Sequence, residues 1–190
     1  MNKKFVYAAL GLSIIVGSSY VILSSNYTET KSAAIKTASS EPKVSYKVSD
    51  EELSQAAKEI GEINDEKMLF TRMMEMTFQK LEWKDHKFQI PGTIVEKRIQ
   101  MTKGNIQYIK ERTKSIEVTE NKEHILDKWT TGDFNSIEKD FREIRDSLSP
   151  GNDKYNPENG PAKRAEESEK EYIQHFFGDD GLEQHNKQWK

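Results

Sequence analysis

Four methionines lie close together in the chain and could do chemistry through their sulfur atoms. Thioether sulfur is a soft ligand that suits Cu(I) outside the cell, and flexible methionine side chains can also adapt to a protein partner. The same residues fall on the apolar stripe of a predicted helix, however, so packing in the core is the plainer interpretation. The candidate interaction surface that they would form consists of Met68, Met73, Met74 and Met76.

Two glutamate and histidine pairs have the spacing of one helical turn that a zinc ligand pair can use. They are Glu120 with His124 and Glu171 with His175. Each pair lacks a third partner, and the chain contains no cysteine that could supply a thiolate. The Gly-x-Ser-x-Gly and His-Glu-x-x-His motifs of hydrolases are also absent from the sequence. We therefore predict no catalytic residue, no metal site and no cofactor, and we expect that the protein is not an enzyme.

The elements that must position these residues follow a long stretch without charge, residues 5–23. As a helix this stretch spans about 28 Å, which matches the hydrocarbon core of a membrane. Lys3 and Lys4 directly precede it, and basic residues favour the cytoplasmic side of the membrane. We predict a cytoplasmic N-terminus at residues 1–4, a transmembrane signal anchor at 5–23, and the rest of the chain outside the cell. A cleaved signal, which would make the protein secreted, is the alternative that the sequence leaves open.

Small residues recur at every fourth position within this stretch, at Ala9, Ser13 and Gly17. They would line one face of a membrane helix, where small side chains let two helices approach closely. We therefore name these three residues as a candidate membrane-helix contact for self-association. The competing interpretation is that small residues are common in membrane helices of every kind.

The balance of charge argues against nucleic acid as a partner. The chain has 29 basic and 32 acidic residues, so without the two lysines near the N-terminus 27 basic residues remain against 32 acidic ones. A soluble part with a net charge of −5 repels a phosphate backbone. The absence of cysteine excludes disulfides, and the length of 190 residues leaves room for one modest domain behind the anchor.

A disordered tether is predicted at residues 24–48, because Ser, Thr, Ala and Lys dominate there and large apolar residues are almost missing. Residues 49–177 have the apolar spacing of helices and predict an all-α fold, a small bundle of about five or six helices outside the cell. The second of these helices has the broadest apolar stripe and is expected at the centre of the core. Residues 178–190 are predicted to be a mobile tail.

Capping residues set the expected helix boundaries. Between the second and third helices, Pro91-Gly92 predicts a turn within an ordered loop that places Phe88 and Ile90 on the helices, with a short hairpin as the alternative. Pro161 is expected in the first turn of the last helix. The expected N-caps of the other helices are Ser49, which forms a capping box with Glu52, then Asn64, Thr102, Thr119, and Asp133 or Asn135.

Three motifs in this domain resemble a known family. They are MMEMTFQK at 73–80, MTKGNIQYI at 101–109 and LDKWTTGDFNSIEKD at 126–140, the last with a Trp-x-x-Gly-Asp-Phe corner. The resemblance is to an uncharacterised family, a domain of unknown function, of membrane-anchored or secreted proteins from Gram-positive, spore-forming bacteria. It covers roughly residues 65–177 and implies a helical domain outside the cell. It implies no catalytic residue, because the family has none assigned.

The expected function follows from the anchor, the tether and the missing chemistry. We expect a single-pass membrane protein whose helical domain is a protein-interaction module of the cell envelope. Its partners would be the membrane, through the N-terminal helix, and an envelope protein or a second copy of the chain. The alternative is a ligand-sensing or metal-sensing module that uses the methionine-rich helix, and a small envelope hydrolase is the least favoured class.

Overall fold

The computed structural model describes residues 46–90, 97–119, 121–149 and 160–189. All of them fall in one unit of the chain, Val44–Lys190. The predicted membrane anchor, the candidate contact at Ala9, Ser13 and Gly17, and most of the predicted tether lie outside the described residues. Within the described ranges, none of the helices has the length and apolar character that crossing a bilayer requires.

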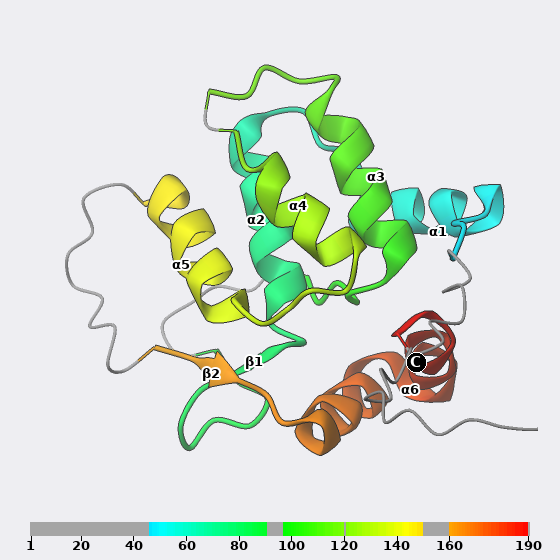
Figure 1. Cartoon of the computed structure of the whole chain (residues 1–190), viewed down its shortest axis with the longest axis vertical. Coiled ribbons are helices and arrows are strands. Elements are labelled where there is room, and N and C mark those ends of the chain that lie inside the picture. The colour runs from blue at the N-terminus through cyan, green and yellow to red at the C-terminus, as the bar shows by residue number, and fades with distance from the viewer. Residues whose placement is uncertain (1–45, 91–96, 120, 150–159, 190) are drawn as a thin grey trace, which may run out of the picture. The chain divides into compact units, whose positions relative to one another are not determined.

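The described part of the chain is mostly helical, which confirms the predicted fold class at that level. It also contains a two-stranded antiparallel sheet that the sequence did not predict. The elements, in chain order (Figure 1), are α1 (Asp50–Ile60), α2 (Glu66–Thr77), β1 (Leu81–Glu82), α3 (Lys103–Thr113), α4 (Glu123–Thr130), α5 (Ile137–Leu148), β2 (Ala162–Lys163) and α6 (Glu166–Trp189).

Helix α2 lies between α3 and α5 and contacts both, as its broad apolar stripe predicted (Figure 1). Helix α1 packs on α3, and α3 packs on α4. One hydrophobic cluster joins these helices, and removing such side chains from water is the main favourable contribution to folding. Its largest fully buried side chains include Phe78, Leu69, Met73, Met76, Ile106, Trp129 and Tyr172.

Two of the predicted helix starts are confirmed in detail. Ser49 forms a capping box with Glu52 at the start of α1, and the Thr102 hydroxyl accepts from Asn105 N–H at the start of α3. Helix α2 is capped by Asp65 rather than Asn64, since the Asp65 carboxylate accepts from Met68 N–H at 2.7 Å.

The start of α4 differs from the prediction for a clear reason. Thr119, the expected cap, donates its N–H and its hydroxyl to the carboxylate of Glu66, each at 2.7 Å. This interaction ties the loop before α4 to the start of α2. The helix begins only at Glu123, whose N–H donates to the Asn121 side chain.

The sheet joins two segments that are far apart in the sequence. Leu81 pairs with Lys163, and Glu82 pairs with Ala162. Arg164 N–H then donates to Lys80 carbonyl at 2.7 Å, which extends the connection by one further bond. Pro161 therefore precedes a strand and not the first turn of the last helix, which starts at Glu166.

The predicted mobile tail is wrong for the residues that the structure describes. The chain remains helical to Trp189, with a kink at Gly178, whose φ of 67° suits glycine. Beyond the kink, the second half of α6 buries Gly181, His185 and Gln188 at helical spacing. The residues on this buried face are small or polar rather than apolar, so the spacing of apolar residues did not predict that this part of α6 packs on the domain.

An irregular and largely buried segment, residues 97–102, leads into α3 without helix or strand. Side chains satisfy its backbone: Lys97 N–H donates to Glu75, Gln100 N–H to Glu59, and Met101 N–H to Gln79. Helix α6 completes this arrangement, because Gln188 accepts from Lys103 N–H at 2.8 Å and Trp189 Nε1 donates to Met101 carbonyl at 2.9 Å. Without these partners the buried backbone groups would lose hydrogen bonds that water supplies in the unfolded chain.

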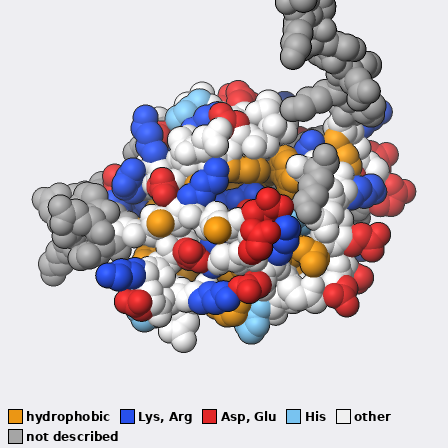
Figure 2. All heavy atoms as spheres, turned by 60° about the horizontal axis from the view of Figure 1, so that its bottom comes forward, with side chains coloured by type: hydrophobic (Ala, Val, Ile, Leu, Met, Phe, Trp, Pro, Cys, Tyr) orange, Lys and Arg blue, Asp and Glu red, His pale blue; other side chains and the backbone are white. Residues whose placement is uncertain are grey.

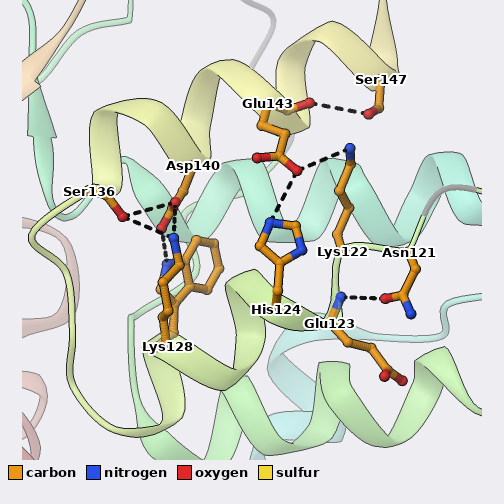
Figure 3. A network of polar contacts seen from close by, with 10 residues as sticks. Asn121, Lys122, Glu123, His124, Lys128, Ser136, Asp140, Glu143 and Ser147 are labelled. Atoms are coloured by element: carbon orange, nitrogen blue, oxygen red, sulfur yellow. Dashed lines mark hydrogen bonds and ion pairs between the residues drawn. The ribbon is translucent and has the colours of Figure 1, made fainter.

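The Trp-x-x-Gly-Asp-Phe corner between α4 and α5 is held by one buried carboxylate. Asp140, which is 1% exposed, accepts from Trp129 Nε1 at 3.0 Å and from Lys128 Nζ at 2.5 Å. Ser136 donates to the same carboxylate at 3.2 Å (Figure 3). Gly132 turns the chain with a φ of 80° where a Cβ would meet the Trp189 ring at 3.3 Å. The corner is thus explained by structure alone.

The substitution Asp140→Ala should lower the free energy of unfolding by about 3 kcal/mol, because it leaves Trp129 Nε1 without its acceptor and removes the partner of Lys128. Urea unfolding followed by tryptophan fluorescence measures the change. The control is Asp146→Ala, which removes an exposed carboxylate from the same helix and should cost about 0.5 kcal/mol or less. Equal effects of the two substitutions would contradict the role assigned to Asp140.

The substitution Trp189→Ala tests whether the end of α6 is docked. It removes a ring that packs edge-on against Phe134 at 5.2 Å and bonds Met101, so it should destabilise the domain by about 2 kcal/mol. The matched control, Glu183→Ala, lies on the exposed side of the same helix and should have little effect. A mobile tail would instead leave the urea midpoint unchanged in both variants.

Candidate functional site

The methionines of the predicted interaction surface do not share a surface. Met73 and Met76 are fully buried in the core. Met68 and Met74 are half-buried and pack against the same cluster from its edge. Met73 and Met76 therefore cannot contact a partner or a metal from outside, and the structure supports core packing as their role.

The described members of the two glutamate and histidine pairs make other contacts than those of a zinc site. His124 Nε2 lies 3.2 Å from Glu143, which also pairs with Lys122 (Figure 3), and Glu120 lies outside the described residues. Glu171 pairs with Lys87. His175 stacks on an aromatic ring instead of facing a carboxylate. In the described ranges no group of three or more His, Asp or Glu side chains is arranged to hold a metal ion.

A cluster of rings and one guanidinium lies where α6 meets the loop after β1. We call it the aromatic patch, and it consists of Phe88, Arg98, His175 and Phe176. The rings of Phe88 and His175 are stacked at 4.5 Å with an angle of 4° between them. Phe176 meets each of these two rings edge-on, at 5.9 and 4.6 Å. His175 is exposed and the other members are half-buried, so the patch forms part of the surface.

Arg98 fixes the patch to the core below it. Its guanidinium carbon lies 4.6 Å from the centre of the Phe176 ring, and its nitrogens donate to the Tyr172 hydroxyl and to Phe88 carbonyl, both at 3.1 Å. Tyr172 is buried, and burial raises the pKa of its hydroxyl, so it stays protonated. The half-buried rings are therefore held in place before any partner arrives.

The surroundings of the aromatic patch are polar. Figure 2 turns forward the side on which the loop after β1 and α6 lie, and it shows hydrophobic side chains between charged side chains of both signs. A hollow of about 640 Å³ is lined by residues 82–87, which directly precede Phe88 in the chain, together with Gly160 and Ala162. An apolar centre with a polar rim is the usual anatomy of a protein interface.

The sequence singled out some of the aromatic residues of this patch but did not predict that they contact one another. Phe88 was expected to fold onto the helices, and Phe176 belongs to the one apolar run of the last helix. Their contact depends on Arg98 and on the loop after β1, which no periodic pattern describes. One signal was available in the sequence: residues 172–177 contain more aromatic side chains than one buried face of a helix can cover, which indicates that some of them lie at the surface.

A buried ion pair holds the first turn of α6. Lys80 Nζ lies 2.6 Å from Glu169 and 4.2 Å from the centre of the Phe134 ring, and both charged side chains are almost fully buried. Gln79 also donates to the Glu169 carboxylate, at 2.7 Å. Burial lowers the pKa of Lys80, while the Glu169 carboxylate opposes that change. The pair links the chain after α2 to α6. Because the Lys80 ammonium is enclosed, it is not accessible as a nucleophile.

The first described residues meet the last ones at a second polar cluster. The Tyr46 hydroxyl donates to Glu52, and Gln188 Nε2 donates to the same oxygen at 3.0 Å. Burial disfavours the charged form of Glu52, but hydrogen bonds from Tyr46, Ser49 N–H and Gln188 outweigh it and hold the pKa of Glu52 below its ordinary value. This cluster ties the start of the domain to the end of α6.

Because the folded state lowers the pKa of Glu52, its stabilising contribution should be fully present above the ordinary value of about 4.3 and should disappear as the pH falls through the lowered pKa. The urea midpoint measured between about pH 3 and pH 7 checks this expectation. The advantage of the wild type over Glu52→Gln should shrink toward acid pH. For the exposed neighbour, Glu51→Gln, the difference from wild type should stay small. A constant difference for Glu52→Gln across the range would refute the linkage.

Comparison with known proteins identifies no relative of this chain. No model of a protein family matches it, and neither a curated protein nor a solved structure is similar to it. A function must therefore be inferred from its own residues.

Proposed function

We propose that this chain is a single-pass membrane protein that displays the helical domain of residues 46–189 outside the cell as a protein-interaction module of the cell envelope. The observation that carries the proposal is the aromatic patch. Aromatic residues and arginine are enriched in protein interfaces and supply most of the residues that dominate binding energy. The patch presents two phenylalanines, a histidine and an arginine at one place on the surface.

The order within the patch favours binding. Phe88 and His175 are stacked, and Arg98 is hydrogen-bonded on two sides. A partner that covers these rings gains the removal of apolar area from water and does not have to immobilise many rotamers. The ion pair of Lys87 with Glu171 stands at the rim, where charges contribute more to specificity than to affinity.

The membrane part of the proposal rests on the sequence. The uncharged stretch 5–23 follows Lys3 and Lys4, which favours an anchor with its N-terminus inside. Secretion after cleavage would leave the interaction proposal unchanged. The sensing alternative has less support, because two of its four methionines, Met73 and Met76, are buried.

Site-specific photo-crosslinking on intact protoplasts tests the proposal. Benzoylphenylalanine replaces Gln89, an exposed residue next to Phe88, and a C-terminal tag reports the location of the domain. We expect external protease to remove the tag, and light to produce a discrete adduct with an envelope protein or a second copy. Adding Phe176→Ser should reduce the adduct about tenfold, because loss of a central ring typically costs 1–2 kcal/mol or more of binding energy.

The control places the same crosslinker at Lys139, an exposed position on α5 outside the aromatic patch, where no discrete adduct should form. A tag that external protease cannot reach would overturn the location. Equal adducts from positions 89 and 139, or an adduct that survives Phe176→Ser, would overturn the patch as the interface. Circular dichroism of Phe176→Ser verifies that the helices remain folded.

A further inference from the structure

A second surface, on the opposite side of α3 from the core, carries an inference independent of the aromatic patch. A groove of about 300 Å³ lies between the first described residues, α3 and the end of α4. We call it the lysine groove. Its lining residues are Tyr46, Val48, Lys103, Gln107, Lys110, Glu111, Lys114 and Thr130.

The three lysines lie along one face of α3, because their spacings of seven and four residues return to the same side of a helix. They contrast with the rest of the domain, since the whole chain is net negative. Against them the lining holds one carboxylate, Glu111, which accepts from Gln107 at 2.9 Å. The groove is therefore locally positive on an acidic protein, which favours a ligand with discrete negative groups.

The inner end of the groove is fixed before a ligand arrives. The Lys103 ammonium lies 5.1 Å from the centre of the Tyr46 ring and 5.0 Å from the centre of the Trp189 ring. Both rings are held in turn, Tyr46 by Glu52 and Trp189 by Met101 carbonyl. Positioning by two aromatic faces restricts the lysine and lowers the entropy cost of an ion pair.

The remaining lysines differ in availability. Lys110 already pairs with Asp127 at 2.5 Å. Lys114 is exposed at the end of α3, and among the described residues it forms no ion pair. The two ends of the groove, Lys103 and Lys114, are therefore the positions at which a ligand would find a free positive charge.

The geometry points to an acidic peptide, in extended form, as the ligand of the lysine groove. Lys103 and Lys114 are eleven positions apart, which corresponds to about 16 Å along the helix axis. An extended chain covers about 13 Å in four residues and places positions i and i+4 on the same side. The long lysine side chains cover the difference, so acidic residues four positions apart would reach both ends.

The other lining residues favour a peptide over a polymer of phosphates. Gln107, between the two end lysines, carries an amide that can bond a peptide backbone, and Tyr46 and Val48 offer apolar contact to the side chains between the acidic ones. Glu111 would repel a ligand that carries a charge at every repeat. The site takes carboxylates at defined positions.

Fluorescence anisotropy with the full-length protein in nanodiscs of neutral lipid tests the inference. The probe is a labelled peptide Ser-Glu-Ser-Thr-Ser-Glu-Ser with blocked ends. Two control peptides replace both glutamates by glutamine or bring them next to each other. The first peptide should bind, and each control should bind about fivefold more weakly or worse, because one or two ion pairs are lost.

Substitutions in the protein complete the test. Lys114→Gln and Lys103→Gln should each weaken the probe about fivefold, while Lys139→Gln, an exposed lysine on α5, should leave its affinity unchanged. Unlike Lys103, Lys114 lies over none of the aromatic rings that the structure describes. An effect of Lys114→Gln therefore cannot come from a disturbed contact with Tyr46 or Trp189.

Four results would overturn the inference: no binding of the probe, equal binding of the three peptides, unchanged affinity in Lys114→Gln, or displacement of the probe by inorganic polyphosphate more readily than by unlabelled peptide. None of them bears on crosslinking at the aromatic patch, so the two proposals can fail separately.

Discussion

The fold depends on the need to pair the backbone of residues 97–102, which has no regular structure, and of the first residue of α3. Residues 99–102 are buried, so side chains must take the place of water as hydrogen-bond partners. Glu75 and Glu59 provide carboxylates from α2 and α1, and Gln79 provides an amide. Helix α6 supplies Gln188 and Trp189. One irregular segment therefore holds together helices from both ends of the domain, and its loss would separate them.

The same constraint explains what the sequence could and could not predict. Helices α1 and α3 were predicted with their caps because a cap is local chemistry, read from Ser49 and Thr102 alone. The second half of α6 was missed because it docks through Gly181, His185 and Gln188, whose partners lie far away in the sequence. Hydrophobic periodicity detects apolar faces, and a face that is small and polar leaves no such signal. The pairing of β1 with β2 was missed because two-residue strands are too short for any pattern.

The two candidate surfaces differ in how much of each could be predicted from the sequence. Phe176 was visible in an apolar run, whereas the contact of its ring with Arg98 required the tertiary structure. The lysines of the second surface are ordinary in a chain with so many charges, and only the presence of Tyr46 and Trp189 around Lys103 distinguishes them. Of the four methionines on α2, Met73 and Met76 are core residues, and Met68 and Met74 lie half-buried at the edge of the core. Chemical character alone did not separate buried from exposed positions on α2, since both of its sides are covered.

The meeting of Tyr46 with Gln188 gives the domain a particular mechanical geometry. Any pull that reaches the domain through the preceding chain acts first on Tyr46, and through its hydroxyl on Glu52 and on the last turn of α6. A pull on the preceding chain would therefore act first on the hydrogen bonds that fasten the C-terminal turn.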